Sequence, residues 1–134
     1  SKSEYLARYR VADLFLDTQP YNAGATASDA LRMGLPVLTC LGNSFASRVA
    51  ASLLNAVNLP ELITTNQEQY ESLAIQLAKN PEKLNTIKEK LNNNLIKSPL
   101  YNTPLYTQHL ESAYTMMYDR YQRDLDPDHI YVKH

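Results

Sequence analysis

Two short apolar runs, each followed by a turn and a helix-like segment, constrain the fold of this chain more than any other feature. The runs are residues 11–16 and 36–40, and a helical segment at residues 26–33 separates them. All three glycines of the chain lie in the turns of this section, at positions 24, 34 and 42. Because strands that alternate with helices usually pair in parallel, the pattern predicts an α/β fold with a short parallel sheet in β-α-β-α order.

Helical patterns dominate the remainder of the chain. A helix with an apolar face is predicted after the second strand, and residues 59–63 form a short edge strand or a turn. Residues 65–68 have capping-box spacing, with Thr65 as the cap, and open a helix that Asn80-Pro81 ends. Two more helices follow, one ending near Ser98-Pro99 and one beginning at Thr103-Pro104. The last has an apolar stripe that we expect to pack: Tyr106, Leu110, Tyr114, Met117 and Tyr121.

Composition excludes several classes of protein and site. The net charge of −1 over 134 residues provides no general attraction for nucleic acid or an anionic membrane. Cys40 is the only cysteine, so an internal disulfide is impossible, and its place at a strand end suits a small core residue. His109, His129 and His134 lack metal-ligand spacing. We therefore expect no nucleic-acid, membrane or metal partner, and a cytoplasmic location.

The chain is expected to be a piece of a longer protein. It begins with Ser1 rather than methionine. A sheet of so few strands would also leave a strand edge unpaired, which folded proteins usually cover or protect.

The loop between Asp17 and Asp29 is the best candidate for a ligand site, because ligands bind beyond the carboxyl ends of strands in open α/β sheets. Small residues occupy positions 23–28, where a helix begins and supplies unpaired N–H groups to a phosphate. Thr26 and Ser28 add hydroxyl donors, and Asp29 suits a ribose diol. An ordinary helix cap produces the same pattern, and no Gly-x-Gly-x-x-Gly or Walker lysine motif is present, so spacing leaves both interpretations open.

Several ordered blocks of the sequence resemble the C-terminal lobe of the O-GlcNAc transferase and SPINDLY family, in its bacterial form. The longer blocks are residues 16–18, 21–31, 33–39 and 45–54, and shorter ones lie at 60–63, 98–103 and 127–129. The resemblance implies the Rossmann-like half of a GT-B C-terminal lobe, followed by C-terminal helices. It implies a donor-binding segment at residues 1–65, helices of the same lobe at 66–123 and a polar tail at 124–134.

The same resemblance implies an activity. Family members transfer N-acetylglucosamine from UDP-GlcNAc to Ser or Thr of an acceptor protein, without a required metal or other cofactor. The other lobe and tetratricopeptide repeats would lie elsewhere in the same protein, so we expect this piece alone to be inactive and to hold no catalytic residue. Two alternatives stay open: a GDP-sugar-dependent O-fucosyltransferase-like enzyme and a non-catalytic scaffold module.

By resemblance, the turn at Gly24, Ala25 and Thr26 lies on the donor diphosphate, and Asp29 lies on the ribose. Family members often carry His-Thr-Thr where this chain has Gly24-Ala25-Thr26. One imidazole and one hydroxyl are therefore absent, and backbone N–H groups would carry more of the diphosphate binding.

Two residues near the start of the chain complete the implied donor site. Tyr5 matches a family histidine that packs on uracil, and Arg8 matches an arginine close to the donor. Tyr5 is equally well explained as a packed helix aromatic. Arg48, on the second strand–helix turn, is expected to anchor its helix rather than to face the donor.

Overall fold

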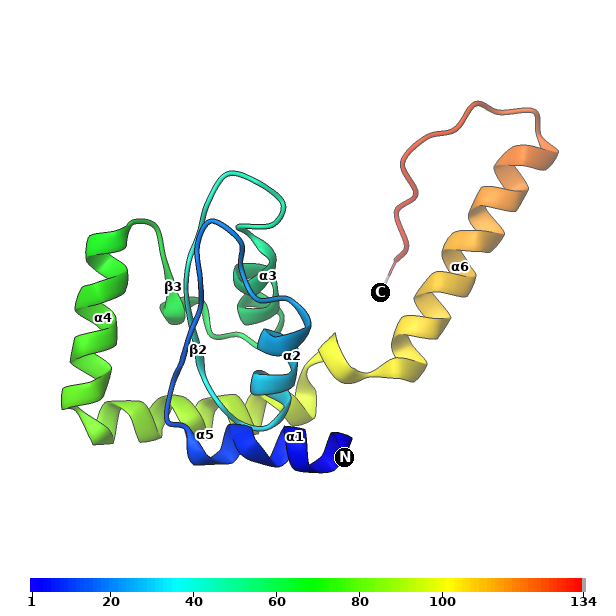
Figure 1. Cartoon of the computed structure of the whole chain (residues 1–134). Coiled ribbons are helices and arrows are strands. Elements are labelled where there is room, and N and C mark those ends of the chain that lie inside the picture. Colours follow the sequence, from blue (N-terminus) through cyan, green and yellow to red (C-terminus); the bar gives the residue numbers. More distant parts are fainter. Residues whose placement is uncertain (134) are drawn as a thin grey trace. The chain divides into compact units, whose positions relative to one another are not determined.

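The computed structural model describes residues 1–133, which belong to two compact units, Ser1–Leu100 and Tyr101–His134 (Figure 1). The first unit contains α1 (Lys2–Arg8), η1 (Tyr9–Val11), β1 (Phe15–Leu16), α2 (Ala25–Arg32), β2 (Val37–Cys40), α3 (Val49–Ala56), η2 (Pro60–Leu62), β3 (Ile63–Thr64), α4 (Gln67–Lys79) and α5 (Pro81–Lys97). The short helix η3 (Pro99–Tyr101) follows, and α6 (Thr103–Gln122) lies in the second unit.

The three strands form a parallel sheet in the order β1-β2-β3. Phe15 pairs with Val37 and Leu16 with Leu38, while Thr39 pairs with Ile63 on the other side of β2. All four residues of β2 are buried, as expected for a central strand with helices on both sides. Figure 1 shows β2 between α4 and the pair α2 and α3. The predicted α/β class with a short parallel sheet is therefore confirmed.

The first strand is much shorter than predicted. Residues 11–14 lie outside β1, and the Val11 side chain is 88% exposed. The Phe15 N–H donates to the Pro36 carbonyl at 2.9 Å, and the ladder cannot continue past Pro36 because proline has no N–H to return. Within the described residues, the other edge of β1 has no strand partner. The apolar run at residues 11–16 was predicted to be a buried strand: its first four residues lie outside the strand, and within the strand Phe15 is only partly buried and Leu16 is exposed.

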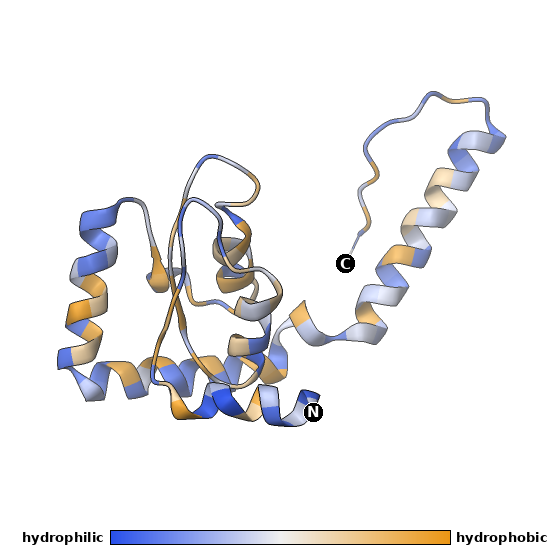
Figure 2. Cartoon of the chain, in the orientation of Figure 1, coloured by the Kyte–Doolittle hydropathy of each residue, from blue (hydrophilic) through white to orange (hydrophobic). Residues whose placement is uncertain are grey.

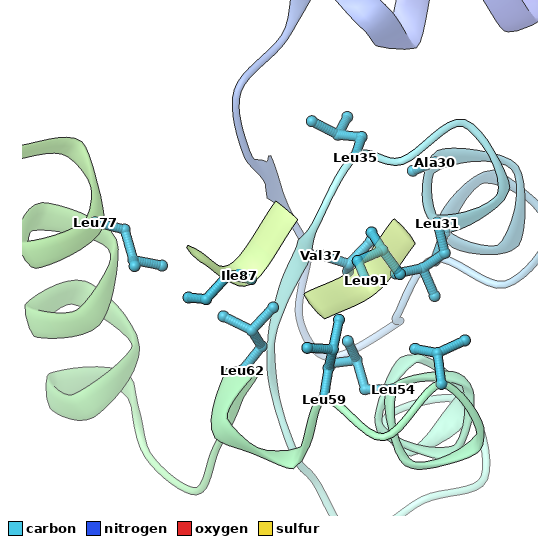
Figure 3. Close-up of a cluster of buried hydrophobic side chains, with 12 residues drawn as sticks. Ala30, Leu31, Leu35, Val37, Leu54, Leu59, Leu62, Leu77, Ile87 and Leu91 are labelled. Atoms are coloured by element: carbon cyan, nitrogen blue, oxygen red, sulfur yellow. The ribbon is translucent and has the colours of Figure 1, made fainter. Parts of the chain in front are cut away.

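A leucine-rich core joins the helices to the sheet. Figure 3 shows side chains from α2, β2, α3, α4 and α5 converging on one cluster. Its members are Ala27, Ala30, Leu31, Leu35, Val37, Leu54, Val57, Leu59, Leu62, Leu77, Ile87 and Leu91. Each fully buried leucine contributes about 1.5–3 kcal/mol relative to an exposed one. Figure 2 shows how apolar and polar residues are divided between core and surface: β2 is apolar, and α4 and α5 carry many polar residues.

Helix ends mostly follow the sequence signals. Gly34 follows α2 with a φ of +80°, as predicted for a helix-terminating glycine. Asn80 caps α5 by accepting from the Lys83 N–H, with Pro81 in the first turn, so the predicted break is confirmed. The cap of α4 was placed one residue too early, because Asn66 rather than Thr65 accepts the helix N–H, from Gln69.

The second unit differs from expectation in its packing. None of the residues of α6 is buried, and the Tyr106, Tyr114 and Tyr121 side chains are exposed. The expected packing of this aromatic stripe is therefore not found within the described residues. In the tail, the Arg120 guanidinium donates to the Asp126 carbonyl, and His134 lies outside the described residues.

The boundary between the two compact units differs from the boundary between the two predicted segments. Leu77, Ile87 and Leu91 belong to the same core cluster as Val37 of the sheet, so α4 and α5 fold with the sheet up to Leu100. The division into a donor-binding segment, 1–65, and lobe helices, 66–123, stays a prediction. Within residues 1–133, no helix is long and apolar enough to cross a membrane.

Candidate functional site

The loops that follow β1 and β2 lie at the same edge of the sheet. The first, residues 17–24, joins β1 to α2, and the second, residues 41–48, joins β2 to α3. A backbone hydrogen bond of 2.9 Å from the Asn22 N–H to the Ala46 carbonyl links them. This edge is where an open parallel sheet offers a ligand its binding site.

The start of α2 has no side-chain cap. Gly24 is the N-cap residue and has no hydroxyl or carboxylate to accept a helix N–H. In α4, α5 and α6, by contrast, an asparagine side chain accepts such a bond. The first N–H groups of a helix have no carbonyl partner inside it, so they carry a partial positive charge. Ala25 and Thr26 are exposed here, while Ala27 is buried, so a ligand can reach the first turn.

The loop before this turn is held by polar groups that sequence reasoning did not select. One Asp17 carboxylate oxygen accepts from the Thr18 and Ala23 N–H groups at 2.8 and 2.7 Å, and the other accepts from the Thr39 hydroxyl at 2.6 Å. The buried Asn22 amide donates to the Thr18 carbonyl at 3.0 Å. An Asp directly after an apolar run was the available signal, but only the fold shows which groups it contacts.

Two tyrosines of the N-terminal segment form a pair. The Tyr5 and Tyr9 hydroxyls are 2.6 Å apart, and their rings meet edge to face with centroids 5.5 Å apart. Burial, the hydrogen bond to Tyr5, and the charges of Tyr5 and Asp29 raise the pKa of Tyr9 to about 12. Tyr9 lies in η1, and two of the predicted site residues, Tyr5 and Asp29, both contribute to its raised pKa.

Tyr5 and Arg8 also line a hollow of about 410 Å³ between α1 and β1. Its other lining residues come from positions 9–16 and Leu35, so the first turn of α2 is not part of it. Tyr5 is 40% exposed, which leaves ring surface free beside its contact with Tyr9. The position is compatible with both interpretations of Tyr5, as a stacking surface and as a packed aromatic.

The secondary candidates behave as structural residues. The Arg48 guanidinium donates to the Gly42 carbonyl at 3.1 Å, which ties the start of α3 to the preceding loop, as expected of an anchor. Cys40 is buried at 3% exposure, which confirms its core position. Among residues 1–133, no three His, Cys, Asp or Glu side chains gather where they could hold a metal ion.

Comparison with known proteins identifies the family. The sequence model of glycosyl transferase family 41 matches residues 1–110, which include every residue of the candidate site. The chain belongs to glycosyl transferase family 41. This family 41 chain is 38% identical over 118 residues to a Petunia hybrida protein named as a probable UDP-N-acetylglucosamine–peptide N-acetylglucosaminyltransferase SPINDLY. It is 33% identical over 130 residues to the UDP-N-acetylglucosamine–peptide N-acetylglucosaminyltransferase of Caenorhabditis elegans.

The family 41 chain spans only a small part of these relatives. The matches cover 88% and 97% of this chain but 13% and 11% of the Petunia and Caenorhabditis proteins. A solved structure of a mutant Thermobaculum terrenum O-GlcNAc transferase superimposes with a TM-score of 0.78 and 36% identity, covering 85% of this chain and 22% of that one. These findings confirm the predicted family and fold class, a Rossmann-like α/β part of a GT-B glycosyltransferase.

Proposed function

We propose that this chain is the nucleotide-sugar-binding part of a protein O-linked N-acetylglucosaminyltransferase. The whole enzyme would transfer N-acetylglucosamine from UDP-GlcNAc to Ser or Thr hydroxyls of an acceptor protein. The observation that carries the proposal is the uncapped N-terminus of α2, which lies beyond the carboxyl end of β1 in a family 41 chain. The names of the Petunia and Caenorhabditis relatives support UDP-GlcNAc as the donor.

The first turn of α2 would hold the donor diphosphate. Negative charge grows on the leaving diphosphate as the bond to the sugar breaks, so groups that stabilise this charge lower the barrier. The backbone N–H groups from Gly24 to Thr26 and the positive end of the helix dipole would provide this stabilisation, and the Thr26 hydroxyl would donate one more bond. These groups and cations from the rest of the protein would replace a metal ion.

The nucleoside would lie toward α1. The Asp29 carboxylate, one helical turn from Thr26, would accept hydrogen bonds from the two ribose hydroxyls. Tyr5 would stack on the uracil with the ring surface that its contact with Tyr9 leaves free, and Arg8 would add a cation nearby.

The rest of the enzyme would come from the same polypeptide. We propose a cytoplasmic protein in which a second lobe and tetratricopeptide repeats supply the acceptor site and the catalytic groups. Residues 1–134 alone would then show no transferase activity. A sensitive transfer assay that detects turnover by residues 1–134 would contradict this part of the proposal.

Calorimetry on the longest natural polypeptide that contains residues 1–134 tests the donor assignment. UDP, GDP and ADP would be titrated into the wild type and into a Thr26→Ala, Asp29→Ala double variant. Removing hydrogen bonds to a charged ligand costs about 1.5–3 kcal/mol each, so UDP affinity is expected to fall at least tenfold. A Thr115→Ala, Asp119→Ala double variant makes the same changes on exposed positions of α6 and should bind UDP as the wild type does.

Two other outcomes of the titration would change the proposed function. Selective GDP binding would replace UDP-GlcNAc with a GDP-sugar, as in an O-fucosyltransferase-like enzyme. A folded wild-type protein that binds none of the three nucleotides would refute the enzyme assignment and favour a scaffold module.

A further inference from the structure

The carboxylate of Asp17 is buried beside the candidate site and is fully engaged. The residue is 6% exposed and follows β1 directly. Burying a carboxylate costs several kcal/mol unless hydrogen bonds replace its hydration. Here three donors do so: the Thr18 and Ala23 N–H groups on one oxygen, and the Thr39 hydroxyl on the other.

Asp17 also belongs to a chain of buried polar groups that crosses the sheet. The Thr64 hydroxyl on β3 donates to the Thr39 carbonyl at 2.9 Å, and the Thr39 hydroxyl on β2 donates to Asp17. From α4, the Tyr70 hydroxyl donates to the Asp17 carbonyl at 2.8 Å. Fully satisfied polar networks of this kind hold their members in one arrangement. Thr39 of β2 thus holds the Asp17 carboxylate, and Tyr70 of α4 holds the Asp17 backbone.

The hydrogen bond from the Ala23 N–H to the Asp17 carboxylate links this fixed group to the start of α2. The Ala23 N–H belongs to the peptide plane between Asn22 and Ala23. Because Ala23 directly precedes the N-cap residue Gly24, holding this plane orients the chain as it enters the turn. The same bond removes the Ala23 N–H from the set that a ligand could use. The N–H groups that remain for an anion therefore begin at Gly24, and Asp17 determines where they point.

We propose that Asp17 is a positioning residue for the donor diphosphate, which acts by orienting the turn from Gly24 to Thr26. This inference rests on the proposed function, because it concerns the same site. The proposal requires two opposing effects of Asp17 on anion binding. Its negative charge repels the diphosphate, and its hydrogen bond to Ala23 orients the turn. Binding is strengthened because the orienting effect is the larger of the two. A carboxylate that acted only through its charge would weaken anion binding.

Three variants of the longest natural polypeptide containing residues 1–134 separate these roles. Asp17→Ala removes the anchor and the charge together. Asp17→Asn removes the charge but keeps an oxygen that accepts from the Ala23 N–H. Ile87→Val removes one methylene from the core cluster, outside this polar network, so it is the control for damage to the core.

The expected result for UDP binding by calorimetry is a graded loss. Asp17→Ala should weaken binding about tenfold or more, the equivalent of one hydrogen bond to a charged group. Asp17→Asn should recover most of that affinity, and Ile87→Val should stay within about threefold of the wild type. A folded Asp17→Ala variant that binds UDP as well as or better than the wild type would overturn the proposal, as would an equal loss in Ile87→Val.

Amide hydrogen exchange gives a second measurement that needs no nucleotide. In Asp17→Ala, the Ala23 amide should exchange at least tenfold faster, whereas Asp17→Asn and Ile87→Val should leave it protected. If no variant or wild-type protein bound a nucleotide, the proposed function would fail while exchange still tested the orienting role. Unchanged exchange in Asp17→Ala would refute that role. If Asp17→Ala did not fold, a tenfold loss of UDP affinity in Asp17→Asn with the Ala23 amide still protected would refute it instead.

Discussion

Gly34→Ala is the substitution whose cost follows most directly from the structure. Gly34 follows α2 with a φ of +80°, and an added Cβ would lie 2.8 Å from the Asn92 side-chain oxygen. A non-glycine residue in the left-handed region costs about 1–2 kcal/mol. Moving the end of the Asn92 side chain off its rotamer costs about 0.5–1.5 kcal/mol more. Alanine also reduces the entropy of the unfolded chain, which offsets about 0.4–1 kcal/mol.

The sum predicts that Gly34→Ala lowers the free energy of unfolding by about 0.5–3 kcal/mol. Urea denaturation followed by circular dichroism measures it. Repeating the substitution in an Asn92→Ala background separates the two causes, because only the cost of the backbone conformation remains there. Gly24→Ala is the matched control, since Gly24 has a φ of −100° and its added Cβ would meet Val49 at an ordinary 3.7 Å. Equal costs at Gly34 and Gly24, or a Gly34→Ala cost below about 0.5 kcal/mol, would refute the conformational argument.

Two further predictions concern the core and the tyrosine pair. Leu91→Ala should lower the free energy of unfolding by about 2–5 kcal/mol because Leu91 is fully buried, whereas Ile96→Ala, at an 86% exposed position of the same helix, should change it by less than about 0.5 kcal/mol in the same urea assay. Tyr9 should ionise near pH 12 rather than 10 in an absorbance titration, and Tyr9→Phe should remove that late step. The raised pKa means that the folded state holds this proton more tightly, so the associated stability is complete below pH 10 and is lost as the pH rises toward 12. A Tyr9 that titrated with the exposed tyrosines would show that its burial and its bond to Tyr5 are not maintained.

Local patterns were enough to predict most elements of the fold. Apolar runs, glycines and prolines located β2, most of the helices and the ends of α2 and α5, because these signals act within a few residues. The small residues from Ala23 onward, at the start of a helix after a strand, led to the prediction of a ligand site at this edge of the sheet. The same signals failed for residues 11–14, because the length of β1 depends on Pro36, which precedes β2.

Other features could not have been predicted, because they depend on contacts between distant residues. Asp17 meets Thr39, 22 residues later, and Tyr70, 53 residues later. The influence of Asp29 on the pKa of Tyr9 likewise joins α2 to η1, which are separate segments of the sequence. The aromatic stripe of α6 has the periodicity of a packed face, yet no residue of that helix is buried. Periodicity reports which residues share a face, and it contains no information on whether a partner covers that face.

The order of residues was therefore sufficient for the family and the α/β class, and it led to the prediction of a phosphate-binding turn. Each of these depends on short stretches such as residues 21–31, whose conformational preferences are local. The arrangement around this turn, from the Asp17 carboxylate to the Tyr5 and Tyr9 pair, exists only after folding. The hydrogen bonds and burial that define it join segments far apart in the chain, and their geometry is settled when the sheet and its helices pack into one core.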